Sequence, residues 1–157
     1  MAQSHIPHGK GETKMANSKA SAQWDGSIKT GKGVMKPSHA AEIPFTFGSR
    51  FEGQPLSNPE ELIGAALAGC FSMALSLGLE QAGAPPRIIR TTADVRLDKD
   101  GDGFAIAAIE LTTQAVVPGL DSAKFQAIAE ATKKACPVSK ALAGVRNISL
   151  KASLASS

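Results

Sequence analysis

One apolar segment, residues 62–79, constrains the fold of this chain more than any other feature. Asn58 and Pro59 precede it, and these residue types favour the N-cap and the first position of a helix. Gly83 follows it and favours a helix end. The segment is apolar on nearly all sides, and such a helix must be covered on most of them. The sequence therefore predicts a buried core helix that runs from Asn58 to about Gln81.

The length of the chain and its first residues bound the domain organisation. A chain of 157 residues can bury one core of its own. Residues 1–20 are polar and lack the apolar stretch of a secretory signal. We expect a flexible N-terminal extension over residues 1–20, a single domain over 21–157, and a cytoplasmic location. Gly and Ser interrupt the apolar segment, so no run reaches the ~18 residues of a membrane span.

The remaining elements are a series of strands and two further helices. Alternating patterns and glycine-rich turns predict a hairpin over 22–37 around residues 30–33, and single strands over 43–47, 88–97, 104–117 and 147–154. Helical spacing marks residues 121–135, and Pro137 can begin a shorter helix through Ala143. This order of elements predicts an α+β domain.

Charge and aromatic content argue against nucleic-acid partners. The net charge is +3, and the chain holds six Phe, one Trp and no Tyr. Base stacking needs exposed aromatic rings, and phosphate tracking needs clustered positive charge. We therefore expect no nucleic-acid binding and no membrane partner.

Metal sites are also disfavoured. The acidic turn at residues 98–103 imitates the start of a calcium loop, but Ile109 occupies the twelfth position, where a Glu is required. All three His residues precede residue 40, and neither cysteine has a Cys or His at ligand spacing. We expect no metal and no cofactor.

The two cysteines, Cys70 and Cys136, are the candidate reactive groups. Cys70 lies within the apolar helix, where an inert core thiol is one interpretation. Cys136 stands directly before Pro137 at the start of a helix, a setting that lowers the pKa of a thiol. Two cysteines without a signal peptide favour inert thiols or redox chemistry over a structural disulfide framework.

A buried Cys70 could ionise only beside a cation. Arg50, shortly before the apolar helix, is the nearby candidate, and Glu60 in the first helical turn could orient it. Spacing alone does not select this partner. A solvated Arg50 and a Glu60 that complements the helix dipole stay open as alternatives.

Several segments together carry a resemblance to a known family. They are residues 49–53 (SRFEG), 58–66 (NPEELIGAA), 68–76 (AGCFSMALS), 91–95 (TTADV), 117–119 (VPG) and 136–139 (CPVS). In this combination the sequence resembles the OsmC/Ohr family of osmotically inducible and organic hydroperoxide resistance proteins over residues 20–155. The place of Arg50, just before the NPEEL helix, resembles the OsmC branch.

This resemblance implies a fold and an assembly. The fold would be the α+β, OsmC-like type, an intertwined homodimer. In it, long buried central helices are wrapped by curved, mainly antiparallel sheets, and the active sites lie at the subunit interface. A second chain would then cover the helix over residues 62–79.

The resemblance also implies a reaction. The chain would be a two-cysteine thiol peroxidase, an oxidoreductase that reduces alkyl or lipid hydroperoxides to alcohols. Cys70 matches the nucleophile, which becomes a sulfenic acid, and Cys136 matches the resolving residue, which condenses with it to a disulfide. A dithiol reductant, a lipoylated protein in this family, would restore both thiols.

The remaining site residues follow from the same resemblance. Arg50 would hold the Cys70 thiolate and polarise the peroxide, and Glu60 would fix Arg50. The apolar side chains of Phe51, Leu62 and Phe71 would line a substrate pocket.

Two other functional classes stay open. A redox sensor could use the same cysteine pair to signal, although no DNA-reading element is visible. A binding protein for a small apolar ligand could keep both thiols structural.

Overall fold

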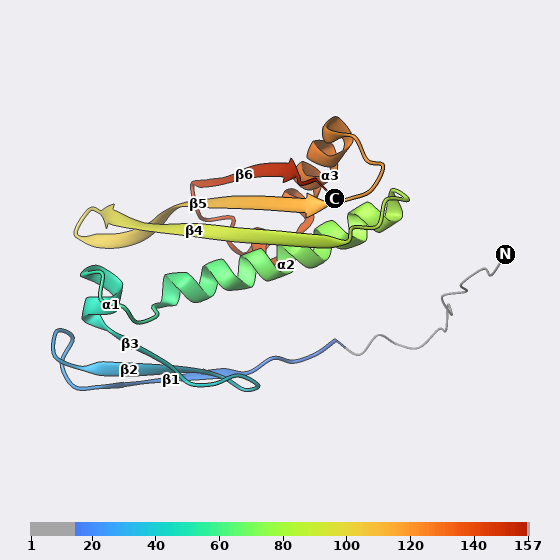
Figure 1. Ribbon diagram of the computed structural model, residues 1–157. Helices are drawn as coiled ribbons and strands as arrows, with labels where there is room; N and C mark the ends of the chain where they lie inside the picture. The colour runs from blue at the N-terminus through green and yellow to red at the C-terminus, as the bar shows by residue number, and fades with distance from the viewer. Residues whose placement is uncertain (1–14, 157) are drawn as a thin grey trace.

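The computed structural model describes residues 15–156, and within them the chain forms two three-stranded sheets and four helices (Figure 1). The predicted α+β fold class is confirmed, with one mixed and one antiparallel sheet. Most of the expected extension, residues 1–20, lies outside the described residues.

The N-terminal sheet contains β1 (Ala20–Asp25), β2 (Lys32–Pro37) and β3 (Ile43–Thr46), all antiparallel. The hairpin turn lies earlier than expected, and Gly33 belongs to β2 rather than to the turn. The rings of Trp24 and Phe45 lie 5.4 Å apart. A Cβ at position 33 would lie 2.5 Å from Phe45 and 2.7 Å from Trp24. Gly33 therefore permits ring packing and does not supply a turn.

A short helix, α1 (Phe47–Phe51), follows β3 where the sequence pattern predicted only the end of a strand. Its start is a capping box. The Ser49 N–H donates to Thr46 Oγ1 at 3.0 Å, and the Thr46 N–H donates to Ser49 Oγ at 3.0 Å. The Ser49 hydroxyl also donates to the Ser57 carbonyl at 2.7 Å, which ties α1 to the start of the next helix.

The predicted core helix is α2 (Pro59–Gln81). Asn58 caps it by accepting a hydrogen bond from the Glu61 N–H at 2.9 Å. Gly83, at φ +75°, follows its end in the left-handed conformation that glycine tolerates. One face of α2 is fully buried, and its members are Leu67, Phe71, Leu75 and Leu79.

The second sheet has the order β4 (Ile88–Asp100), β5 (Gly103–Val116) and β6 (Asn147–Leu154). β4 and β5 are antiparallel, and β5 and β6 are parallel. The first two strands extend into the acidic segment, so the turn between them is shorter than predicted. Figure 1 shows this sheet and the N-terminal sheet on opposite sides of α2.

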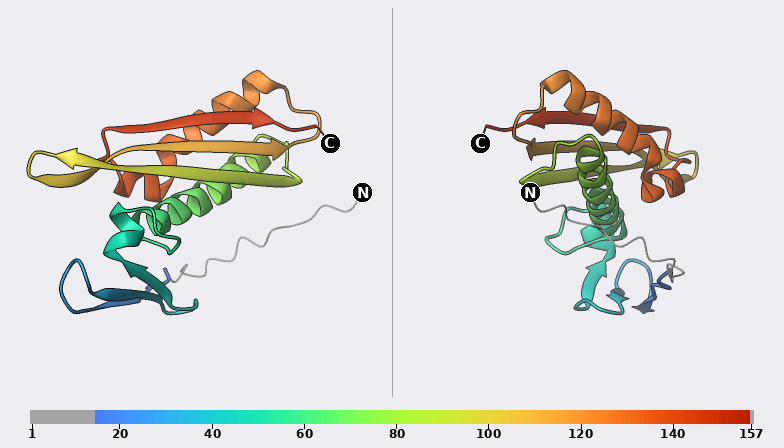
Figure 2. Two further views of the ribbon diagram at one scale, coloured as in Figure 1. Left: turned by 60° about the vertical axis from the view of Figure 1, so that its left-hand side comes forward. Right: turned by 90° about the vertical axis from the view of Figure 1, so that its right-hand side faces the viewer.

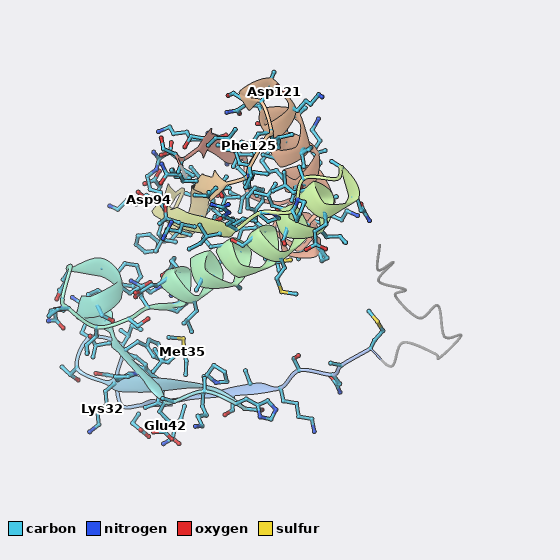
Figure 3. The ribbon with its side chains drawn as sticks, turned by 45° about the vertical axis from the view of Figure 1, so that its right-hand side comes forward. Lys32, Met35, Glu42, Asp94, Asp121 and Phe125 are labelled. Carbon is cyan, nitrogen blue, oxygen red and sulfur yellow. The ribbon has the colours of Figure 1, made fainter. Side chains whose placement is uncertain are left out.

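Two further helices, α3 (Ser122–Ala135) and α4 (Pro137–Ala141), complete the fold. α2 contacts β4, α3 contacts β6, and the two helices contact each other beside the sheet (Figure 2). Phe125 points from α3 into this core, and Asp121 caps the helix (Figure 3). Alternate residues of β5 are buried beneath the helices, while Thr112 and Gln114 are exposed on the other face.

The opposite face of α2 is not covered by any other part of residues 15–156. Met73 is 78% exposed and Leu77 is 56% exposed, and Ala65, Ala66 and Gly69 share this stripe. By length and composition α2 could also cross a membrane, a test that core helices pass too. The sequence predicted a helix that is covered on most sides. Within one chain, the described residues cover only the face that holds Leu67, Phe71, Leu75 and Leu79.

Candidate active site

The two cysteines meet in one chain although 66 residues separate them. Cys70 lies near the middle of α2 and is partly buried. Cys136 ends α3, caps α4 and has no exposed surface. Both are free thiols, and their Sγ atoms lie 3.0 Å apart, within hydrogen-bond distance. The backbone break before Pro137 allows this approach, because it turns the chain back toward α2.

The two thiols have opposite tendencies to ionise. Burial raises the pKa of Cys70, and the hydrogen bond that its S–H donates to a Cys136 thiolate raises it further. Burial also pushes the pKa of Cys136 upward, but the hydrogen bond shared with Cys70 and the backbone of Ser139 and Val138 outweigh it and leave that pKa below its usual value. In a single chain, Cys136 is therefore the thiol that ionises first.

Arg50 and Glu60 form a second cluster. Arg50 Nη2 donates to Glu60 Oε1 at 2.6 Å, and Arg50 Nε donates to the same oxygen at 3.0 Å. The Glu60 side chain is 8% exposed and that of Arg50 is 38% exposed. The Asn58 amide donates to the Ser49 carbonyl at 3.1 Å, which fixes the α1–α2 connection. The carboxylate thus orients a guanidinium that still reaches solvent.

The ion pair and the sulfur pair are far apart within one chain. Glu60 and Cys70 are ten residues apart on α2, which corresponds to about 15 Å along the helix axis. Arg50 and Glu60 instead line a cleft of about 440 Å³ with the middle of β4. The structure brings Arg50 to Glu60 but does not bring either to Cys70.

The three expected pocket residues lie in three different places. Phe71 is fully buried in the core and offers no surface to a substrate. Leu62 lines a cleft of about 380 Å³ beside β1 and β2. Phe51 is 36% exposed and packs on Phe104, with ring centres 5.0 Å apart. These residues do not form one pocket in a single chain.

Sequence reasoning overlooked Ser139. It lies in the first turn of α4, three residues after Cys136, and is 8% exposed. Its hydroxyl oxygen is buried and has no hydrogen-bond partner among the described residues. The CPVS segment offered a signal, since the third residue of a helix points back toward its cap.

Within residues 15–156, no cluster of three or more His, Cys, Asp or Glu side chains is placed to hold a metal ion. The chemistry that these residues offer is that of two adjacent thiols and, in a separate cluster, one oriented cation.

The sequence pattern of the OsmC-like protein family matches residues 52–151. The chain belongs to the OsmC-like family. It is 51% identical to a protein named peroxiredoxin OsmC from Escherichia coli, over 79% of this chain and 88% of that protein. An organic hydroperoxide resistance protein-like relative from Staphylococcus aureus is 29% identical over 74% of this chain and 83% of its own length.

Solved structures of OsmC-like and related proteins share the fold. An organic hydroperoxide resistance protein from Elizabethkingia anophelis superposes with a TM-score of 0.67 at 25% identity, over 92% of this chain and 99% of that chain. An OsmC-like protein from Mycoplasma pneumoniae gives 0.71 at 14% identity, over 90% and 99% of the two chains, which bears on the fold alone. With 51% identity to a peroxiredoxin over most of its length, this OsmC-like chain is a peroxidase.

Proposed function

We propose that the protein is a two-cysteine peroxidase that reduces organic hydroperoxides to alcohols. The observation that carries this proposal is the 3.0 Å separation of Cys70 Sγ and Cys136 Sγ within one chain. The Cys70 thiolate attacks the O–O bond and releases the alcohol, leaving a sulfenic acid. The Cys136 sulfur then attacks Cys70 and releases water, which forms an intramolecular disulfide.

The difference in exposure supports this division of roles. Cys136 has no exposed surface, whereas Cys70 is partly exposed, so an incoming peroxide can reach Cys70. A thiol peroxidase must ionise its nucleophile, and burial opposes this at Cys70. Among the described residues of a single chain, no positive charge favours the Cys70 thiolate, so the site is incomplete.

Arg50 of a second copy completes the site in this proposal. If two α2 helices cross in antiparallel fashion near residue 65, Glu60 of one helix lies opposite Cys70 of the other. Ala65, Ala66 and Gly69 occupy this part of the exposed stripe, and small residues allow helices to approach closely. Arg50, which is paired with Glu60, would then lie next to the Cys70 sulfur of the other chain.

The N-terminal sheet supports the same homodimer. Met35 lies on its α2-facing side, whereas Lys32 and Glu42 lie on the other side (Figure 3). Met35 and Leu62 line the cleft beside β1 and β2, an apolar surface that a second α2 helix could fill. In this arrangement Phe51 and Leu62 approach the thiols from the partner subunit, while Phe71 stays in the core.

An apolar cleft supports organic substrates. It has a volume of about 500 Å³ and lies between α2 and α3. Ala74, one helical turn after Cys70, and Pro137, next to Cys136, line it together with Leu77 and Ile128. The name of the Staphylococcus aureus relative, organic hydroperoxide resistance protein-like, agrees with such a substrate. We further propose a dithiol reductant carried on a lipoylated protein, no bound cofactor, and action in the cytoplasm.

The test is steady-state consumption of cumene hydroperoxide with dihydrolipoamide as reductant. The wild-type protein should turn over, and Cys70→Ser should not exceed the rate without protein. Without reductant, Cys136→Ser should consume one equivalent of peroxide and retain a Cys70 sulfenic acid, whereas the wild type should form the Cys70–Cys136 disulfide. A wild-type rate equal to that of Cys70→Ser would refute the proposal. Oxidation of the pair by peroxide without turnover would instead favour the redox sensor.

A further inference from the structure

The position of Ser139 bears on how the disulfide is reopened. A hydroxyl that is buried without a partner costs stability, so its retention calls for a partner in another state of the site. Its natural first partner, the backbone N–H of Cys136, already donates to the Thr132 carbonyl at 2.9 Å. The Ser139 hydroxyl is nevertheless near enough to Cys136 to favour the thiolate form of that residue.

The sulfurs also differ in access. Reduction of a disulfide by a thiolate needs one sulfur that can be attacked in line and one that leaves as a thiolate. Cys70 is partly exposed on α2, whereas Cys136 is fully buried between α3 and α4. The backbone of Ser139 favours an anionic sulfur at Cys136 alone, whereas that of Val138 favours one at either cysteine. Attack at Cys70 and departure of Cys136 satisfies both requirements.

We propose that reduction is directed to one sulfur, with the reducing dithiol attacking Cys70 Sγ while the Ser139 hydroxyl donates a hydrogen bond to Cys136 Sγ as it leaves. This inference rests on the proposed two-cysteine function, and it adds a residue and a direction to the second half of the cycle.

The first thiolate of the dithiol forms a bond to Cys70 Sγ, and the Cys70–Cys136 bond breaks with its electron pair on Cys136. The second thiol of the reductant, as a thiolate, then attacks its own linked sulfur and releases Cys70 as a thiolate. The dithiol is oxidised by two electrons to a cyclic disulfide, and the enzyme pair is reduced by two electrons. The protons lost by the dithiol are available to the cysteine thiolates.

The first measurement locates the attacked sulfur. Full-length wild-type protein is oxidised to the Cys70–Cys136 disulfide with diamide, mixed briefly with 2-mercaptoethanol, quenched with acid and mapped by mass spectrometry. The adduct should lie on Cys70, with Cys136 free. An adduct found mainly on Cys136 would overturn the direction of attack. Because diamide replaces peroxide, this outcome does not depend on peroxidase activity.

The second measurement tests Ser139. We compare the rate at which dihydrolipoamide reduces the oxidised wild-type protein with the rates of Ser139→Ala and Ser139→Thr. Loss of one hydrogen bond to a charged group should slow Ser139→Ala by about tenfold. Ser139→Thr keeps the hydroxyl and should restore most of the rate. The Cys136 thiolate titration should move to higher pH in Ser139→Ala only.

Controls separate this role from a structural one. The Ser139 hydroxyl has no partner to lose among the described residues, so Ser139→Ala should unfold near the wild-type temperature. Ser149 is a partly buried serine on β6, and dihydrolipoamide should reduce the oxidised Ser149→Ala protein at the wild-type rate. Equal reduction rates for Ser139→Ala and the wild type would refute the role of Ser139. If the wild type also fails to consume peroxide, the proposed function fails separately.

Discussion

The exposed stripe of α2 allows a direct test of the second copy. Met73 is 78% exposed in one chain, so Met73→Asp removes no core contact, and such surface changes alter the free energy of unfolding by about 0.5 kcal/mol. In a dimer the same position would be buried. Loss of the apolar side chain and burial of a carboxylate should then cost about 3 kcal/mol in each subunit.

Both subunits carry the change, so the two effects sum to about 6 kcal/mol, which raises the dissociation constant of the dimer on the order of 10⁴-fold. Sedimentation velocity at micromolar concentration should show a monomer. Cumene hydroperoxide consumption should fall with it, because Cys70 loses Arg50 of the partner subunit. Diamide should still join Cys70 to Cys136, since their sulfurs lie 3.0 Å apart in one chain.

The matched control is Ala127→Asp, an equal charge change at an exposed position of α3. It should leave association and activity unchanged. Two results would contradict the reasoning. A Met73→Asp protein that remains a dimer would place the interface elsewhere, and a monomer with full peroxidase activity would show that Cys70 needs no second chain.

Three further outcomes follow from the same geometry. Arg50→Met should raise the Cys70 pKa and slow the peroxide step at neutral pH, because the thiolate loses its cation, whereas an unchanged thiolate titration would exclude Arg50. In monomeric Met73→Asp, the peroxide step should accelerate only as pH rises beyond 9.0, the usual pKa of a cysteine thiol, because the raised pKa of Cys70 keeps it protonated at lower pH. A rate independent of pH would contradict this. Leu75→Ala should lower the free energy of unfolding by about 2–5 kcal/mol in urea titrations, because Leu75 is fully buried, and a loss below 1 kcal/mol would refute its place in the core.

The sequence predicted most of the helices and strands, because their caps, turns and apolar periods lie within or next to each element. Asn58 and Asp121 both cap the helices that the sequence assigned to them. The sequence did not predict the short helix α1, because its five residues show no apolar period. Only its capping box, formed by Thr46 and Ser49 at the end of a strand, marks its start. Gly33 was misplaced in a turn because its reason, the packing of two rings, comes from residues on neighbouring strands.

The site was less accessible to such rules, because it depends on contacts between distant segments. Nothing local indicates that Cys136 reaches Cys70, since the break at Pro137 fixes where α3 ends but not which helix it meets. The resemblance supplied that pairing, and the structure shows the contact. Ser139 was missed because a serine in a first helical turn is common, and only its buried, unpartnered oxygen distinguishes it.

The order of ionisation ties the thiols to the proposed assembly. In one chain the hydrogen bonds favour a Cys136 thiolate, and burial keeps Cys70 protonated. That order suits reduction, in which Cys136 leaves as an anion, but it opposes the peroxide step, in which Cys70 must be the anion. A cation at Cys70 reverses the order without disturbing the donors around Cys136. Glu60, which holds Arg50, lies about 15 Å along α2 from Cys70 of its own chain, so we infer that a second chain supplies that cation. A peroxidase built this way would be nearly inert as a monomer and would gain its reactive thiolate on assembly.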